Sequence, residues 1–212
     1  MKHFVFDFDG TLVDTDGLFN ACLRHALEPF SVDAGSGSDF MEKIRHKHPY
    51  RIFEDLLEPH QAEEALKRLQ DVGKKLSLDI KSFQGIEESL DKIKSRGVGL
   101  CIWTGRDGGS TERILSNLKL NHYFDKIVSG TCVETNKPGQ DGLHMVADFL
   151  KAKPEELIMV GDHHHDIEPA NQFGSFSVHA KWKKKPHSLP NGVLPNIEFE
   201  KVDEFNLWLS QI

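Results

Sequence analysis

Polar residues follow four apolar segments of the 212-residue chain, in the order DFDGT, WTGRD, NKPGQD and GDHHHD. Their side chains are of types that bind cations or anions. The six residues concerned are Asp7, Asp9, Thr104, Lys137, Asp162 and Asp166. If the fold gathers them, the result is a patch that holds several carboxylates beside one hydroxyl and one ammonium group.

Such a patch has a definite chemistry. Neighbouring carboxylates repel one another and need a cation, and ligand sets made only of oxygen suit a hard ion such as Mg²⁺, which also accepts substrate phosphate as a ligand. An ammonium group and backbone N–H groups neutralise and position phosphate oxygens. With repulsion reduced in this way, one carboxylate can attack phosphorus, and a second carboxylate two residues on can act as acid and base.

The apolar segments themselves predict buried strands. Four short runs show little alternation, as in parallel sheets covered on both faces, and a fifth run at 176–180 is weaker. Amphipathic helical patterns lie between them. The alternation predicts an α/β fold, a Rossmann-like doubly wound parallel sheet. Ligands of such sheets bind beyond the carboxyl ends of the strands, where all four polar clusters stand.

Residues 15–82 interrupt this alternation, because they contain two amphipathic helical patterns and no strand-like run. We therefore expect two domains. One is an α/β core formed by residues 1–14 and 83–212, and the other is an inserted all-helical cap domain formed by residues 15–82. A final helix is expected near 203–211.

Composition limits the classes of function. The net charge of −7 argues against nucleic acid as the main partner. No apolar run approaches the roughly 18 residues of a membrane span, and two aspartates interrupt the first apolar run, which argues against a signal peptide. Three widely spaced cysteines favour a reducing compartment, so the expected location is cytoplasmic.

The ordered set DFDGT, threonine, lysine and GDxxxD resembles the haloacid dehalogenase-like superfamily. All four motifs of that family occur in order, and the helical insert lies where its subfamily I phosphatases, similar to phosphoglycolate phosphatase, carry a helical C1 cap. The lysine segment NKPGQD departs slightly from the usual spacing of prolines. The resemblance implies a phosphoric monoester phosphatase (EC 3.1.3.-) with Mg²⁺ as its cofactor.

The resemblance also implies a role for each motif residue. Asp7 would be the nucleophile and a metal ligand, and Asp9 would be the acid and base and would offer Mg²⁺ its backbone carbonyl. Asp162 would bind the metal directly, and Asp166 would bind it through water or pair with the lysine. Phosphate would be bound by Thr104, Gly105 and Lys137.

Three consecutive histidines, 163–165, separate the two aspartates of the last motif. The family leaves these positions variable, although the first is often Ser or Thr. Adjacent residues cannot all face one ion without unusual backbone bending, so a zinc or nickel site is not favoured over spacer residues. His163 is the best candidate for a substrate contact.

Other basic residues allow two interpretations. Arg106 could clamp a second anionic group of a substrate or form a surface ion pair. The segment 45–51, RHKHPYR, could meet an anionic substrate, although a solvated helix face is favoured. The run of lysines at 183–185 is interpreted as solvated surface.

The sequence is compatible with three functions. The favoured one is a Mg²⁺-dependent phosphomonoesterase that acts on a small phosphorylated metabolite through an aspartyl phosphate, with the cap closing over the site. The second is phosphoryl transfer of the β-phosphoglucomutase type, which would keep the same motifs. The third is a non-catalytic scaffold or sensor. The presence of all the motif residues argues against it, because such a role does not require them. The expected state is a monomer or small homo-oligomer.

Overall fold

The computed structural model describes residues 2–32 and 49–212. The chain divides into two compact units, of which the larger comprises Met1–Asp14 with Ile80–Ile212 and the smaller comprises Thr15–Asp79. The sequence-based division placed the return to the core at residue 83. In the structure the larger unit begins again at Ile80, because β3 (Lys81–Ser82) pairs antiparallel with β2 (Val13–Asp14).

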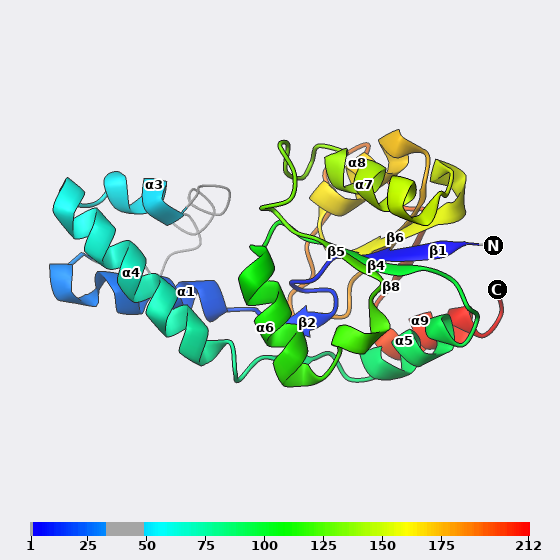
Figure 1. The fold of residues 1–212 in the computed structure, drawn as a ribbon, viewed down its shortest axis with the longest axis horizontal. Helices are drawn as coiled ribbons and strands as arrows, with labels where there is room; N and C mark the ends of the chain where they lie inside the picture. Colours follow the sequence, from blue (N-terminus) through cyan, green and yellow to red (C-terminus); the bar gives the residue numbers. More distant parts are fainter. Residues whose placement is uncertain (1, 33–48) are drawn as a thin grey trace. The chain divides into compact units, whose positions relative to one another are not determined.

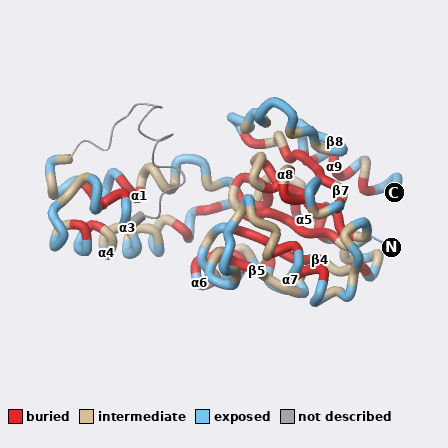
Figure 2. Tube along the Cα trace, turned by 90° about the horizontal axis from the view of Figure 1, so that it is seen from above, coloured by how far each residue is buried: buried red, intermediate tan, exposed pale blue. Residues whose placement is uncertain are grey.

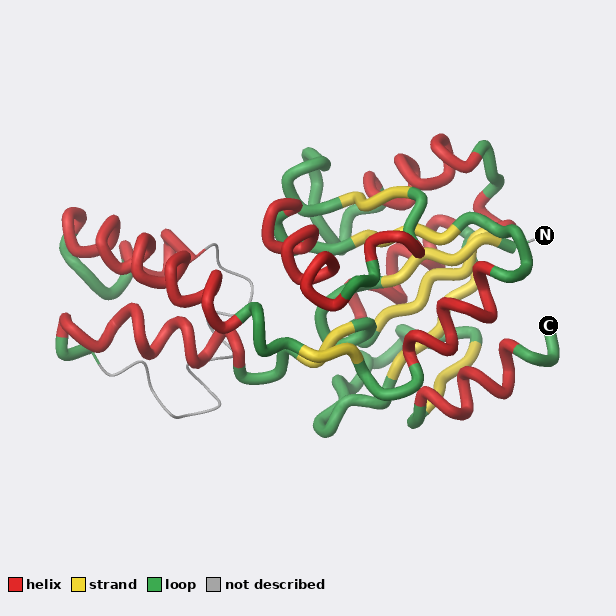
Figure 3. The backbone as a smooth tube through the Cα atoms, turned by 60° about the horizontal axis from the view of Figure 1, so that its bottom comes forward, coloured by secondary structure: helices red, strands yellow, loops and turns green. Residues whose placement is uncertain are grey.

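The larger unit is built on a parallel sheet. Within the described residues the sheet has six strands in the order β5-β4-β1-β6-β7-β8. Figure 3 shows the strands of the sheet side by side, with helices around them. In chain order these are β1 (His3–Phe6), β4 (Leu100–Trp103), β5 (Lys126–Val128), β6 (Leu157–Gly161), β7 (Phe176–Ala180) and β8 (Ile197–Phe199). Every neighbouring pair is parallel. This arrangement confirms the predicted Rossmann-like α/β fold.

Helices cover both faces of this sheet. From β1 the sheet extends through β4 and β5 on one side and through β6, β7 and β8 on the other. The helices α7 (Asp141–Leu150) and α8 (His164–Phe173) cover one face of the sheet (Figure 1). The opposite face is covered by α5 (Ile86–Lys94), α6 (Gly108–Leu118) and α9 (Val202–Leu209). Short 3₁₀ turns, η2 (Asn121–Tyr123) and η3 (Pro154–Glu156), precede β5 and β6. Since the strands are buried on both faces, their sequences are apolar runs.

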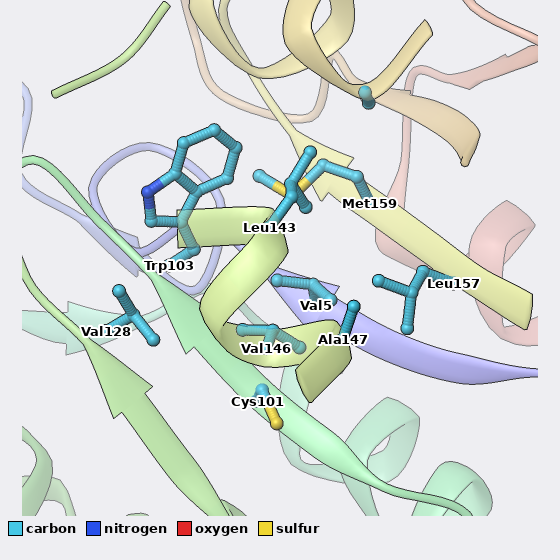
Figure 4. Close-up of a cluster of buried hydrophobic side chains, with 10 residues drawn as sticks. Val5, Cys101, Trp103, Val128, Leu143, Val146, Ala147, Leu157 and Met159 are labelled. Atoms are coloured by element: carbon cyan, nitrogen blue, oxygen red, sulfur yellow. The ribbon is translucent and has the colours of Figure 1, made fainter. Parts of the chain in front are cut away.

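One core cluster lies between the sheet and α7 and α8. The largest member is Trp103 at the end of β4, which is 1% exposed and lies beside Val128 and Leu143 (Figure 4). Burial is continuous along the central strands (Figure 2). A buried side chain of this kind contributes about 1.5–3 kcal/mol to folding. The cluster thus fixes the ends of the strands, from which the polar residues extend.

The smaller unit is helical. Its elements are α1 (Leu18–Leu27), η1 (Glu28–Phe30), α3 (Pro49–Glu54) and α4 (Pro59–Leu76). Their apolar faces form a separate core that includes Leu23, Leu27, Phe53 and Ala65. Most of the basic segment at 45–51 lies outside the described residues, so its predicted contact with an anionic substrate remains a prediction.

No helix in the described part of the chain combines the length and the apolar character that crossing a membrane requires.

Candidate active site

Three carboxylates meet at the carboxyl edge of the sheet. Asp7 directly follows β1, Asp162 directly follows β6, and Asp166 lies in the first turn of α8. One oxygen of each lies within 4.8 Å of the others, and all three residues are buried. The parallel arrangement of β1 and β6 brings the first two together although they are far apart in the sequence.

Lys137, from the loop between β5 and α7, joins two of these carboxylates. Its Nζ donates to Asp7 Oδ1 at 2.7 Å and to Asp166 Oδ1 at 2.6 Å, and its side chain is 8% exposed. The same Nζ lies 4.6 Å from the ring centroid of Trp103, which adds a cation–π contact. The position of the ammonium group is therefore fixed both by the buried Trp103 and by the two carboxylates.

The charges of the cluster are only partly balanced. Burial raises the pKa of Asp7 well above its usual value, and Asp166 and Asp162 add to this rise while Lys137 opposes it. Burial also raises the pKa of Asp162 to about 6. For Lys137, burial alone would lower the pKa, but attraction to Asp166 and Asp7 outweighs it and raises the pKa. An additional cation would reduce the electrostatic repulsion between these carboxylates.

The support under Lys137 depends on a glycine. A Cβ at Gly142 in α7 would lie 2.0 Å from Trp103 Nε1. We expect Gly142→Ala to lower the free energy of unfolding by about 1–3 kcal/mol, because the indole must move. Urea unfolding should show this loss, whereas Gly109→Ala, at the equivalent second position of α6, should not, because its Cβ would meet nothing closer than 3.6 Å. Equal effects would contradict the argument.

Asp9 is held apart from the buried carboxylates by an ion pair. Both of its oxygens accept hydrogen bonds from Arg106, from Nη2 to Oδ1 at 2.6 Å and from Nε to Oδ2 at 2.9 Å. Asp9 and Arg106 remain partly exposed. The predicted contact of Arg106 with a substrate stays a prediction, and in this structure its partner is the proposed acid and base.

Thr104 and Gly105 form the turn after β4. Thr104 is buried, its N–H donates to the Val128 carbonyl at 2.9 Å, and its Oγ1 accepts from the Arg106 N–H at 3.1 Å. Gly105 is exposed, and a Cβ there would meet nothing within 4 Å. The turn thus leaves the backbone at Gly105 accessible to a ligand.

Gly10 allows the first motif to approach the last. It has φ +82°, and a Cβ there would lie 2.5 Å from Asp162 Oδ2. A side chain at this position would therefore push Asp162 out of the cluster. The glycine of DFDGT is explained by this close approach.

Lys183 is a site residue that the sequence analysis missed. Its Nζ lies 2.6 Å from Asp162 Oδ2, and both side chains are 5% exposed, so the interpretation of this lysine as solvated surface was wrong. The preceding Trp182 donates from Nε1 to the Thr11 carbonyl at 3.0 Å, which ties the loop to the first motif. Lys184 and Lys185 are exposed, as expected.

The raised pKa of Asp162 predicts a pH effect on the metal-free protein. Between pH 3.8, the usual pKa of an aspartate, and about pH 6, the carboxyl is protonated in the folded state but ionised in the unfolded state. The free energy of unfolding therefore falls as the pH rises through this range. The difference in unfolding free energy between Asp162→Asn and wild type should therefore change in favour of the variant by about 2 kcal/mol from pH 4 to pH 7. Urea unfolding in EDTA measures the difference, and a constant difference would contradict the prediction.

His163 stands at the start of α8. Its backbone N–H donates to Asp166 Oδ2 at 3.1 Å, and its Nδ1 accepts from the His165 N–H at 3.3 Å. Asp166 therefore caps the helix and also pairs with Lys137. The predicted contact of His163 with a substrate stays a prediction.

The donor set fits a magnesium ion. Three buried carboxylates face two ammonium groups, Lys137 and Lys183, so one negative charge is not compensated within the cluster. Oxygen donors with surplus negative charge are the ligands that Mg²⁺ prefers. Asp9 contributes no side-chain oxygen to this cluster. The predicted role of its backbone carbonyl stays a prediction.

Comparisons with known proteins agree with this architecture. The pyrophosphatase PpaX of Bacillus mycoides (strain KBAB4) is 26% identical over 209 residues, which span 98% of this chain and 96% of that protein. A predicted phosphoglycolate phosphatase of Haemophilus somnus 129pt has a TM-score of 0.84 at 18% identity, covering 100% of this chain and 98% of that one. An inferred beta-phosphoglucomutase of Thermotoga maritima has a TM-score of 0.81 at 24% identity, covering all of both chains.

These structural likenesses show the fold. The model of the family described as haloacid dehalogenase-like hydrolase matches residues 4–180, which contain all four motifs. The chain therefore belongs to the haloacid dehalogenase-like hydrolases.

Proposed function

We propose that this hydrolase is a Mg²⁺-dependent phosphomonoesterase that uses Asp7 as its nucleophile. The observation that carries the proposal is the meeting of Asp7, Asp162 and Asp166 within 4.8 Å, with Lys137 bonded to two of them. The carboxylates of Asp7, Asp162 and Asp166 would hold Mg²⁺. When bound, the ion supplies positive charge that offsets the phosphoryl oxygens.

The reaction has two steps. An Asp7 carboxylate oxygen attacks phosphorus, the bond to the leaving oxygen breaks, and Asp9 gives that oxygen a proton. Asp9 then takes a proton from water, which attacks phosphorus and releases phosphate and the Asp7 carboxylate. Since Arg106 holds both oxygens of Asp9 in this structure, the ion pair must open for these transfers. Lys137 keeps the Asp7 carboxylate oriented.

The proposed substrate is a small phosphorylated metabolite. Relatives that span nearly the whole chain are named pyrophosphatase, and a structural neighbour is named phosphoglycolate phosphatase. Both names refer to small phosphorylated compounds. We assign the choice of leaving group to the helical unit, in the role of a cap.

The test is phosphate release from a panel of small phosphoesters and pyrophosphate, with Mg²⁺ and with EDTA. The proposal expects release of inorganic phosphate from at least one compound, and loss of that release in EDTA. Conversion of a sugar phosphate to its isomer without net phosphate release would instead establish a mutase. Neither activity on any compound would favour a non-catalytic role.

A further inference from the structure

We propose that His163, His164 and His165, beside the ring of His187, form a binding site for one transition metal ion that prefers nitrogen ligands, such as Zn²⁺ or Ni²⁺. The ligand atoms of the first three lie within 4.8 Å of one another. Their ring centroids are 4.1 Å apart for His163–His164, 4.6 Å for His163–His165 and 4.1 Å for His164–His165. Three imidazoles therefore converge on one small region.

The backbone explains why consecutive residues converge. His163 is the N-cap of α8 and has extended backbone angles, φ −128° and ψ 156°, whereas His164 begins the helix. The chain thus changes direction within the triplet, and the rings collect on one side. This is the bending that the sequence alone gave no reason to expect. The His163 ring is also held by the hydrogen bond that its Nδ1 accepts from the His165 N–H.

A fourth imidazole comes from another segment. The ring of His187, in the loop after β7, lies 4.7 Å from that of His163 at an interplanar angle of 87°. Its side chain is 25% exposed, and the same loop is tied down through Trp182. Two separate parts of the chain therefore bring histidines to one place.

The ligand type separates this site from the carboxylate cluster. Neutral imidazole suits Zn²⁺, Ni²⁺ and Cu²⁺, whereas Mg²⁺ prefers oxygen. Tetrahedral Zn²⁺ with bonds of about 2.0–2.1 Å needs ligand nitrogens about 3.4 Å apart. Binding requires side-chain rotations that bring the present separations, of up to 4.8 Å, to that value. The three histidines of the triplet are half-buried, so an ion can reach them.

Charge does not prevent binding. The N-terminus of α8 disfavours a cation, but this interaction is weak beside the bonds between a metal ion and several imidazoles. Asp166 in the first turn and Asp162 before the triplet are acidic, and Lys137 and Lys183 pair with them. His187 Nε2 lies 3.7 Å from Asp162 Oδ2. An ion at the histidines would therefore lie beside the proposed Mg²⁺ ligands.

The test is calorimetric titration of Zn²⁺ into the protein in saturating Mg²⁺ at slightly alkaline pH, where imidazoles are neutral. Wild type should bind one Zn²⁺. The double variant His164→Ala/His165→Ala should lose more than the roughly 10- to 100-fold in affinity that removal of an outer partner costs. The control His60→Ala/His122→Ala removes two exposed histidines and should bind as wild type does.

A second readout identifies the ligands. The electron paramagnetic resonance spectrum of bound Cu²⁺ should show coupling to imidazole nitrogen in wild type and lose it in the double variant. If that variant does not fold, His187→Ala must weaken Zn²⁺ binding at least about tenfold. Absence of Zn²⁺ binding in wild type, or equal affinity in the variants, would overturn the proposal. Neither result would affect the phosphatase proposal, which the panel with Mg²⁺ tests separately.

Discussion

Replacement of Asp7 by Asn is expected to lower Mg²⁺-dependent phosphate release at least about 1,000-fold while the fold is retained. Asn keeps the shape of the side chain but cannot attack phosphorus as a carboxylate. Because burial and two neighbouring carboxylates raise the pKa of Asp7, loss of its charge should not destabilise the metal-free protein. Lys137 keeps Asp166 as its partner.

The measurement combines the rate of phosphate release with the thermal midpoint in EDTA. Asp148→Asn, which neutralises an exposed carboxylate on α7, is the matched control and should retain the wild-type rate. A variant at position 7 that folds and keeps more than a tenth of the wild-type rate would contradict the assignment of Asp7. If the variant loses both the rate and the fold, the role of Asp7 is decided by locating the phosphoryl group on the wild-type enzyme.

Replacement of Lys137 by Met should have the largest effect on stability. It leaves Asp7 and Asp166 buried without their common cation and removes the contact with Trp103. Removing one partner of a buried ion pair costs about 3–5 kcal/mol. We therefore expect a loss of that size in the free energy of unfolding measured in EDTA, and a smaller loss in Mg²⁺.

Phosphate release by Lys137→Met should fall by a factor of roughly 100 or more, because the nucleophile loses its orientation and the phosphoryl group loses a positive charge. Lys184→Met is the control, since it removes the same charge from an exposed lysine near the site. An unchanged unfolding free energy in Lys137→Met would show that the two carboxylates do not depend on this ammonium group.

The strands and the converging residues could be predicted because they depend on simple patterns. Apolar runs followed by polar residues predict buried parallel strands with ligands at one edge, and the structure places Asp7 and Asp162 there. The short strand β8 was not predicted. Its three residues include the exposed Glu198, so the run is too short to stand out from the loop before it.

Lys183 could not be recognised as a site residue from its neighbours in the sequence. It is one of three consecutive lysines, and such a run normally indicates a solvated surface. Only the course of the loop, fixed by Trp182 against the first motif, turns this lysine toward Asp162. A tryptophan beside a basic run in a polar loop is the one local signal of an anchored segment.

The pairing of Arg106 with Asp9 also depends on tertiary structure. The two residues are 97 positions apart and meet because β4 and β1 are neighbours in the sheet. Sequence indicated that each could bind a charged partner but not that each is the other's partner. The convergence of the three histidines also could not be predicted from the sequence, because it depends on the backbone angles of His163.

The most direct test of the account is to locate the phosphoryl group on the enzyme. The protein should be mixed with a substrate found in the panel and Mg²⁺, quenched in acid within one turnover, digested, and analysed by peptide mass spectrometry. We predict one phosphorylated peptide, the one that contains Asp7, with the modification on Asp7 and none in Asp7→Asn. Phosphorylation at another residue, or none during active turnover in samples quenched across the first turnover, would contradict it.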